Sequence, residues 1–337
     1  MAKKKKFKNR IISSHAYNFV LRHWQNIRFG RQLRCVANRL RPGDCCVLFS
    51  CIRNEMHRIE FFHAYYKALG VDHFVFVDNG STDGFLEWSA DKADVSVWHT
   101  QAGYKKAGFG VYWCNYLLEK YGTGRLCVTV DPDEFLVYPH IETRSLKDLG
   151  QHLKEIGRPC LNVLMIDAYS DRPVDETVMA PGDDPFAVCP YFDRDGYVQK
   201  QNYMSGTFVQ GGPRLRAFNR DTPKEAPALN KMPVVWWEKH YRYQSSAHSM
   251  WPWKLNRTVT KAGIPVSGAL FHFKFVSSLQ EKVEEEMTRR QHYGGSREYK
   301  RYRDNIRSPL HLAGVSVKYE NADQLVRLGL MNLGEWV

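Results

Sequence analysis

Short apolar runs alternate with amphipathic segments along the first half of the chain. The run Cys45–Ile52 (CCVLFSCI) is almost continuously apolar, which is the pattern of a strand covered on both faces. Apolar residues then recur at helical spacing from Ile59 to Leu69, and Gly70 closes this predicted helix. The alternation continues with predicted strands at 73–77, 94–98, 126–130 and 161–166, and with predicted helices from 85, at 109–121 and at 144–157. This order predicts an α/β fold with a doubly wound, mainly parallel sheet.

The pattern becomes irregular in the second half of the chain. Residues 167–270 are rich in Pro, Gly, Asp and aromatic residues, and their strand-like pieces are short, such as Tyr197–Gln201 and Thr207–Gln210. We interpret this stretch as an irregular lobe beside the sheet. Strand character returns at Ala269–Val276 (ALFHFKFV).

We divide the chain into an N-terminal arm (1–43), an α/β domain (44–304) that ends in charged helices at 279–291 and 298–304, and a C-terminal strap (305–337). The net charge of +12 belongs to the arm, which holds twelve Lys and Arg residues and no Asp or Glu. The rest of the chain is therefore neutral.

A basic arm of this kind could bind nucleic acid or an anionic membrane face. Its aromatic residues are interleaved with the charges, which suits a membrane interface better; they are Phe7, Tyr17, Phe19, Trp24 and Phe29. The alternative is a solubilising tail over Lys3–Arg10, followed by an ordinary packed helix.

Composition indicates a globular protein with a large core. Hydrophobic residues make up 43% of the chain, and no apolar run approaches the ~18 residues of a membrane span. The basic start lacks the apolar core of a secretion signal, so we expect a cytoplasmic protein, peripheral at the inner membrane face if the arm binds lipid. The eight cysteines contain no C-x₂-C pair, and we expect small buried apolar residues rather than zinc ligands.

Three carboxylates follow the predicted strand at 126–130, in the turn Asp131-Pro132-Asp133-Glu134. Unpaired charge is costly to bury, so a cation is expected near this turn. Asp131 and Asp133, with Pro132 stiffening the turn, could present oxygens to one Mg²⁺ or Mn²⁺ ion. Such an ion takes its remaining ligands from water and substrate phosphates. The alternative is a solvated acidic turn.

Polar clusters also follow two other predicted strands, at Arg53-Asn54-Glu55 and at 78–84 (DNGSTDG). Ligands of doubly wound sheets bind outside the carboxyl ends of the strands. Three polar clusters at three strand ends therefore favour a metal–diphosphate site over a solvated turn. Asp78 and Asp83 could instead cap the helix that starts at Phe85, and we favour that interpretation for Asp83.

The order of these motifs resembles the family 2 glycosyltransferases, in a bacterial branch. The resemblance rests on Asn54-Glu55 and on VDNGSTDG (77–84), VDPDEF (130–135), GGPRLRAF (211–218) and LFHFKF (270–275), and covers roughly residues 45–304. It implies the GT-A fold, a nucleotide-sugar donor, and Mg²⁺ or Mn²⁺ as cofactor.

The resemblance also implies roles for individual residues. Asp78 would contact the nucleobase or ribose. Asp131 and Asp133 would form the DxD motif, in which Asp133 binds the metal directly and Asp131 contacts the ribose or metal-bound water. His272 would be an additional metal ligand, although a histidine between Phe271 and Phe273 could equally be a core residue. Further donor contacts are expected from Asn54, Glu55, Lys105 and Arg214, with Lys106 and Lys274 as other cations that could assist or could be surface charge.

A direct-displacement (inverting) transferase needs a carboxylate base near the acceptor hydroxyl. The sequence holds no clean counterpart of the family's second-half acidic pair. Asp167, directly after the strand at 161–166, is our candidate base, and Asp171, Glu238 and Glu298 are rivals. His248 is a candidate on the acceptor side, with a structural role equally open.

We therefore expect a metal-dependent transferase that moves a sugar from a nucleotide donor, a UDP-sugar in our expectation, to a glycan or lipid-linked acceptor of a cell-surface polysaccharide. A nucleotidyltransferase is one alternative, but residues 45–55 lack the Gly-rich basic signature that grips a triphosphate. A nucleic-acid-binding protein with a decayed catalytic body is another, and the intact acidic turn argues against it.

Overall fold

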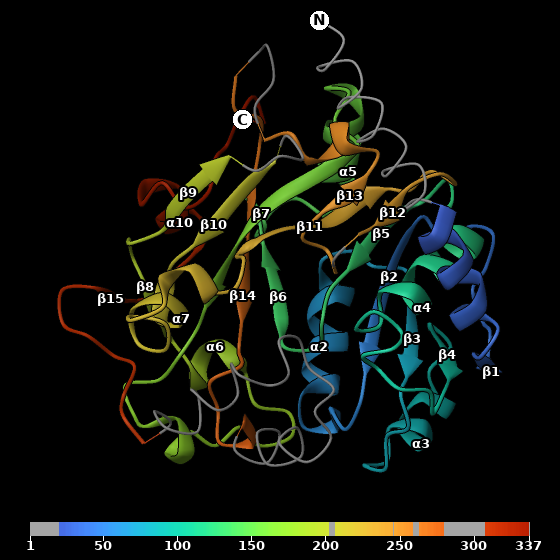
Figure 1. The fold of residues 1–337 in the computed structure, drawn as a ribbon, viewed down its shortest axis with the longest axis horizontal. Coiled ribbons are helices and arrows are strands. Elements are labelled where there is room, and N and C mark those ends of the chain that lie inside the picture. Colours follow the sequence, from blue (N-terminus) through green and yellow to red (C-terminus); the bar gives the residue numbers. More distant parts are fainter. Residues whose placement is uncertain (1–19, 202–205, 245, 259–262, 280–306, 337) are drawn as a thin grey trace, which may run out of the picture.

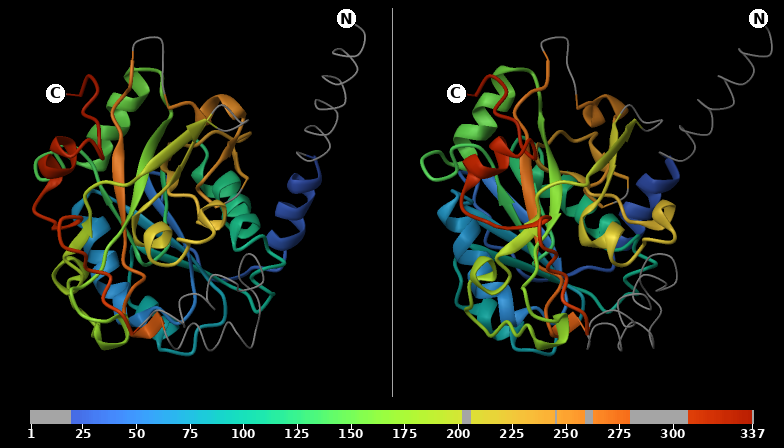
Figure 2. Two further views of the ribbon diagram at one scale, coloured as in Figure 1. Left: turned by 60° about the vertical axis from the view of Figure 1, so that its left-hand side comes forward. Right: turned by 90° about the vertical axis from the view of Figure 1, so that its left-hand side faces the viewer.

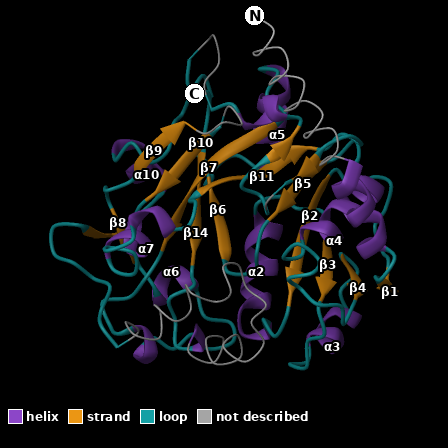
Figure 3. Ribbon diagram, viewed as in Figure 1, coloured by secondary structure: helices purple, strands orange, loops and turns teal. Residues whose placement is uncertain are grey.

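A mixed nine-stranded sheet forms the centre of the molecule (Figure 1). The computed structural model describes residues 20–201, 206–244, 246–258, 263–279 and 307–336. The order of the strands is β1-β4-β3-β2-β5-β11-β7-β14-β6, and helices cover both faces (Figures 1 and 3). The α/β class predicted from the sequence is confirmed.

The first half of the sheet is parallel and follows the predicted alternation. Its four strands pair in the order β4-β3-β2-β5. The strands and their crossover helices are β2 (Cys46–Ile52), α2 (Met56–Ala68), β3 (His73–Asp78), α3 (Phe85–Ala90), β4 (Val95–His99), α4 (Val111–Leu117), which continues as a π-helical turn (Leu118–Gly122), and β5 (Leu126–Thr129). Each predicted strand and helix of this region is confirmed to within a few residues.

The second half of the sheet mixes strand directions. β7 (Cys160–Asp167) and β14 (Gly268–His272) pair in parallel, while β6 (Glu134–Val137) runs antiparallel to β14. Helix α5 (Leu146–Glu155) precedes β7 and begins at a capping box formed by Ser145 and Asp148.

The predicted irregular lobe contains a central strand, which corrects our interpretation of residues 167–270. β11 (Asn230–Trp236) lies between β5 and β7 and pairs antiparallel with both. The sequence did not predict this strand because it contains Pro233. Proline has no N–H to donate to a neighbouring strand, so its presence argues against a central strand. The register with β7 shifts between Lys231 and Val234, which accommodates the proline at an irregularity.

The remaining described elements are short and lie around the sheet. β1 pairs with β4 at one edge, and the others form two-stranded pairs or single turns of helix. They are β1 (Arg34–Ala37), α6 (Pro185–Val188), β8 (Tyr191–Asp193), β9 (Val198–Gln201), β10 (Thr207–Gln210), α7 (Gly212–Arg216), β12 (Arg242–Tyr243), β13 (Met250–Trp251), β15 (Ser316–Lys318) and α10 (Ala322–Arg327), with 3₁₀ turns at Val174–Glu176, Pro223–Glu225 and Trp253–Asn256.

Several predicted segments lie outside the described residues. These are residues 1–19 of the arm and, apart from Leu279, both charged helices predicted at 279–291 and 298–304. Among the residues that the structure does describe, no helix is both long enough and apolar enough to span a bilayer. The three-part division of the chain stays a prediction, and described residues of the strap pack on the sheet, where Tyr319 lies 4.7 Å from Phe271 between ring centroids.

Alternating side chains of the parallel strands build one core on each face of the sheet. Leu48 of β2 belongs to the cluster under α2, α3 and α5, whereas its neighbours Val47 and Phe49 belong to the cluster under α4. The helix formed by residues 20–30 joins the second cluster through Phe29.

The strand directions bring chemically active residues to one edge of the sheet. β7 and β14 run in the same direction as β5, because β11 is antiparallel to both β5 and β7. The carboxyl ends of β3, β5, β7 and β14 and the amino ends of β6 and β11 therefore meet along one edge. This edge carries the acidic turn and is where a ligand of such a sheet is expected.

Candidate functional site

The acidic turn connects β5 to β6 and presents its three carboxylates differently. Backbone bonds close the turn, with the N–H of Glu134 donating to the carbonyl of Asp131 at 3.0 Å. The side chain of Asp131 is 47% exposed and that of Asp133 is 19% exposed, whereas that of Glu134 is buried at 1%. Asp131 and Asp133 are thus open to a ligand, and Glu134 belongs to the support beneath them.

Glu134 is held by Lys231, a residue that our sequence analysis did not identify. The Lys231 ammonium contacts Oε1 of Glu134 and lies 3.5 Å from Oδ2 of Asp131. Burial raises the pKa of Glu134 to about 7, and the charge of Lys231 limits this rise. The only sequence signal was a lysine beside the apolar run MPVVW, which by itself does not point to a partner 97 residues away.

His272 lies between two carboxylates. Its Nδ1 is 2.7 Å from Oδ1 of Asp167, and its Nε2 is 3.4 Å from Oδ2 of Asp133. The sheet register produces this arrangement, because His272 pairs with Asp167 on one side and with Glu134 on the other. The structure therefore brings the predicted metal ligands Asp133 and His272 together.

Asp167 is held too firmly for the role of base that we predicted from the sequence. Arg214 donates to both of its oxygens, at 2.7 Å to Oδ2 and 2.8 Å to Oδ1, and the Asp167 side chain is fully buried. Burial alone would raise its pKa, but Arg214 and His272 outweigh that effect and lower the pKa to about 2. Asp167 positions His272, and Arg214 is engaged with Asp167 rather than facing a donor phosphate.

Arg58 is a second buried cation that our sequence analysis did not identify. Its Nε lies 3.2 Å from Oε2 of Glu55, and its Nη1 lies 3.8 Å from Oδ2 of Asp133 and donates to the carbonyl of Phe273 at 3.2 Å. Glu55, predicted to contact the donor, thus faces Arg58. In sequence, Arg58 is indistinguishable from a surface residue of an amphipathic helix.

The charges of the site do not balance pair by pair. Each of the three buried cations has a nearer carboxylate partner, in the pairs Lys231–Glu134, Arg214–Asp167 and Arg58–Glu55. Asp131 and Asp133 are the more distant partners of Lys231 and Arg58, at 3.5 and 3.8 Å. Asp133 also lies 3.4 Å from Nε2 of His272, and this carboxylate helps to raise the pKa of His272 against the opposing effect of burial.

The donor atoms fit a divalent ion that shares its coordination with a substrate. Asp133 Oδ2 and His272 Nε2 offer two ligands, and the second nitrogen of His272 is fixed by a carboxylate, as is common for metal-bound histidines. Among the described residues, no group of three or more His, Cys, Asp or Glu side chains is placed to hold an ion by itself. Water and phosphate oxygens would have to supply the remaining ligands, as they usually do for Mg²⁺.

The loops after β2 and β3 bind each other rather than facing open space. Asp78 is fully buried, with Oδ2 2.6 Å from Nδ1 of His99 and Oδ1 accepting from the N–H of Ser81 at 2.9 Å. Asn54 joins the two loops, because its Oδ1 accepts from the N–H of Thr82 at 2.8 Å. These predicted donor contacts shape the edge of the sheet.

Asp83 caps a different helix from the one we predicted. Its Oδ2 accepts from the N–H of Met56 at 2.8 Å, at the start of α2, and not from the helix that begins at Phe85. The carboxylate therefore ties the loop after β3 to the helix after β2, an arrangement that sequence spacing does not indicate.

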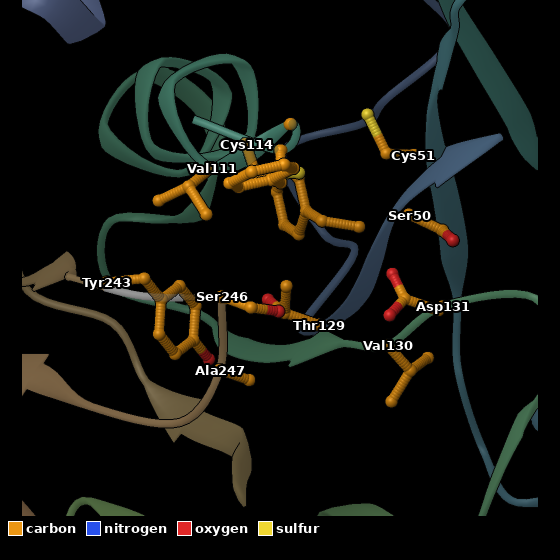
Figure 4. A pocket seen from close by; sticks show the side chains of 13 residues that line it. Ser50, Cys51, Val111, Cys114, Thr129, Val130, Asp131, Tyr243, Ser246 and Ala247 are labelled. Carbon is orange, nitrogen blue, oxygen red and sulfur yellow. The ribbon is translucent and has the colours of Figure 1, made fainter. Parts of the chain in front are cut away.

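A pocket of about 350 Å³, including space open to solvent, lies directly beside Asp131 (Figure 4). Figure 4 shows Asp131 and Ser50 on one side and Val111 and Tyr243 on the other. The hydroxyl of Ser50 is buried, with no hydrogen-bond partner among the described residues. The pocket combines apolar walls with polar groups at one end, as small-molecule sites do.

The loop before α4 that lines this pocket has an uncommon backbone. Gly108, Phe109 and Gly110 all have positive φ angles, of 63°, 58° and 79°. A bulky residue in this region is an outlier, and such outliers cluster at ligand sites. Lys105 is exposed in the same loop, as is Lys106.

The other candidates lie elsewhere or have structural partners. Nδ1 of His248 is 2.7 Å from the carbonyl of Asn230, and burial lowers the pKa of His248 to about 3, so it remains neutral. Asp171 and Glu238 are exposed, and Glu298 lies outside the described residues. Lys274 is half-buried beside Phe273.

Comparison with known proteins adds little to this geometry. No protein-family model matches the chain, and no curated protein sequence matches it. Among solved structures, the chain is similar to the mannosyltransferase PcManGT from Pyrobaculum calidifontis in complex with GDP-Man and Mn²⁺, with a TM-score of 0.24 and 16% identity. The match covers 49% of this chain and 46% of that one, and a superposition this limited establishes neither a shared activity nor a shared ligand.

Proposed function

We propose that this protein is a glycosyltransferase of the GT-A type that binds a nucleotide-sugar donor together with a divalent cation. The observation that carries the proposal is the meeting of Asp133 and His272, which are 139 residues apart in sequence and 3.4 Å apart at the edge of the sheet. They stand beside Asp131 and the pocket that Asp131 helps to line.

Asp133 and His272 would hold Mn²⁺ or Mg²⁺, and the ion when bound would neutralise the charge that develops on the leaving diphosphate. In the reaction, the bond from the anomeric carbon to the phosphate oxygen breaks, and the nucleoside diphosphate leaves with the electron pair. An acceptor hydroxyl forms the new bond to that carbon, and its proton passes to water or to the released diphosphate. Glu134 and Lys231 fix the turn, and Asp167 fixes the ring of His272.

The nucleoside end of the donor would occupy the pocket beside Asp131 rather than the region around Asp78. Both oxygens of Asp78 are engaged by protein groups, whereas the hydroxyl of Ser50 and the carboxylate of Asp131 line the pocket. We propose a UDP-sugar as donor and a glycan or lipid-linked acceptor, as expected from the sequence.

The test is a thermal-shift panel of UDP, GDP and CMP and their sugars, each with and without Mn²⁺. We expect one nucleotide to raise the melting temperature only when the metal is present, because ligands that bind the native state stabilise it by mass action. Release of the nucleoside diphosphate from the matching donor then measures turnover.

The variant Asp133→Ala should lose the metal-dependent shift, and Asp195→Ala serves as the control, because the Asp195 side chain is 69% exposed on a surface loop. An Asp133→Ala protein with the wild-type metal-dependent shift would falsify the site. A shift produced by nucleoside triphosphates alone would support a nucleotidyltransferase instead.

A further inference from the structure

Apolar side chains stand exposed on the helix formed by residues 20–30. Val20 is 52% exposed, Leu21 44% and Trp24 64%, so three of the eight large exposed apolar residues of the described chain share this one helix. At about 100° per residue, these three and Arg28 fall within an arc of about 100°. A cluster of exposed apolar side chains is typical of an interaction surface, whereas apolar side chains exposed singly are common on any protein.

The opposite side of the helix packs on the protein. Phe29 is buried and its ring lies 5.5 Å from that of Tyr112 in α4, and Arg22 donates to the carbonyl of Gln244. Figure 2 shows the helix, in blue, alongside α4 at the edge of the molecule. Packing against the core therefore explains Phe29 and Arg22 but not the exposed Trp24.

Exposed positive charge surrounds this apolar face. Arg28, Arg31, Arg34 and Arg41 are exposed, and residues 1–43 contain no acidic residue. Six further Lys and Arg residues precede the helix in sequence, between Lys3 and Arg10. Apolar and aromatic groups bordered by cations are typical of a helix that lies at the surface of an anionic membrane.

We propose that the helix of residues 20–30 docks on an anionic lipid surface, with Val20, Leu21 and Trp24 entering the headgroup region and Arg28 and Arg31 facing lipid phosphates. A nucleic acid would use the arginines but would leave the aliphatic side chains in water, so the apolar face favours lipid. The surface is separate from Asp133 and His272, and the proposal stands independently of the proposed function.

Docking at this helix would place the candidate pocket close to the lipid. The helix contacts α4 and the β12 strand region, and these same elements supply Val111, Cys114 and Tyr243 to the pocket wall. An acceptor anchored in the membrane would then be near the site without a separate recruiting partner.

The full chain is tested by co-sedimentation with vesicles of phosphatidylcholine alone and of phosphatidylcholine with phosphatidylglycerol. We expect binding to the anionic vesicles only, weakening as salt increases. Leu21→Ser with Trp24→Ser should reduce this affinity about tenfold or more, since both side chains lose their contact with the interface. Arg28→Gln with Arg31→Gln should reduce it about fivefold per charge.

Matched control variants distinguish binding through this surface from non-specific binding to vesicles. Val178→Ser removes an apolar side chain that is 66% exposed elsewhere, and Arg194→Gln removes a half-exposed charge beside Asp195. Both should bind vesicles as the wild type does. Every variant should keep the wild-type melting temperature and the wild-type thermal shift with nucleotide and metal. A failure of the membrane proposal can therefore be told apart from a failure of the proposed donor site.

Three outcomes would overturn the proposal. The first is unchanged vesicle binding by the Leu21→Ser, Trp24→Ser protein, or equal binding to neutral vesicles. The second is salt-sensitive binding to duplex RNA or DNA without binding to vesicles, which would assign the surface to nucleic acid. The third is a dimer in solution that this double variant dissociates, with no vesicle binding, which would assign the surface to a second copy of the chain.

Discussion

Nδ1 of His272 lies 2.7 Å from Oδ1 of Asp167, a carboxylate that Arg214 holds through two hydrogen bonds. This contact fixes the orientation of the imidazole and directs Nε2 toward Asp133, 3.4 Å away. The two carboxylates beside the ring therefore differ: Asp167 is buried and orients His272, while Asp133 is partly exposed on the other side of the ring.

Asp167→Asn is predicted to weaken metal binding without removing a metal ligand. The amide cannot hold His272 and Arg214 as the carboxylate does, so Nε2 of His272 loses its fixed direction. Loss of such a supporting contact typically costs about 10–100-fold in metal affinity. Titration with Mn²⁺ in the presence of the selected nucleotide, followed calorimetrically, measures this change.

The same substitution leaves Arg214 buried with a neutral neighbour, so a fall in stability of about 3–5 kcal/mol is also expected. The control is Arg216→Gln, which weakens a comparable Arg–Asp pair with Asp193, 2.7 Å apart but away from His272. Arg216→Gln should lower stability while leaving metal affinity unchanged. If both variants reduce metal affinity equally, Asp167 has no special positioning role.

Lys231 and Glu134 are predicted to act as one unit. Both side chains are buried, so Lys231→Met leaves an unpaired carboxylate and should lower the free energy of unfolding by about 3–5 kcal/mol. Adding Glu134→Gln removes that charge and should recover most of the loss. Urea denaturation of the two single variants and the double variant gives the coupling energy, and additive effects would contradict the pairing.

Gly110→Ala is predicted to disturb the pocket beside Asp131. A Cβ atom there would lie 2.9 Å from Sγ of Cys51, at a φ angle of 79°. Gly124→Ala is the matched control, because Gly124 has nearly the same φ angle, 81°, and nothing within 4 Å of the added atom. Both variants carry the backbone strain, of about 1 kcal/mol, but only Gly110→Ala adds overpacking, of about 1–3 kcal/mol.

Thermal melts and nucleotide titrations of the two glycine variants measure this difference. We expect weaker nucleotide binding for Gly110→Ala and normal binding for Gly124→Ala. Equal nucleotide affinity in both proteins would show that the pocket does not hold the nucleoside.

The sequence predicted those features that depend on neighbouring residues. Within the apolar run Cys45–Ile52, the strand Cys46–Ile52 is buried on both faces of the sheet, so its strand character is visible locally. The carboxyl-edge position of Asp131 and Asp133 follows from the strand that precedes them. Parallel topology then places the polar ends of successive strands together.

Features that depend on distant pairing were not predictable in this way. β11 contains Pro233 and one lysine, and only its position between β5 and β7 makes it a central strand. Asp167 looked available because its strand ends at the expected edge, but the Arg214 that engages it comes from α7, 47 residues later. A single sequence contains the residues of these contacts but not their register.

Acid sensitivity is predicted at Asp72, which joins β2 to α5. Its Oδ2 accepts from the N–H groups of Cys45 and Cys46 at 2.9 and 3.0 Å, and its Oδ1 accepts from Lys147 at 2.6 Å. Burial alone would raise the pKa of Asp72, but these hydrogen bonds outweigh burial and lower it. The charged form is therefore favoured in the folded state.

Because the folded-state pKa lies below the unfolded value of about 3.9, the contribution of Asp72 is fully present above about pH 5. It is lost as the pH falls through the lower folded-state pKa. Asp72→Asn should lower the free energy of unfolding by about 1–2 kcal/mol at pH 7, a modest loss because the group is partly exposed. The loss should become progressively smaller below about pH 4. Urea denaturation of both proteins from pH 3 to 7 measures the difference. Asp195→Asn is the control and should keep a stability near that of the wild type. If the stability difference between the wild type and Asp72→Asn instead grew toward low pH, the pKa of Asp72 would be raised rather than lowered in the folded state.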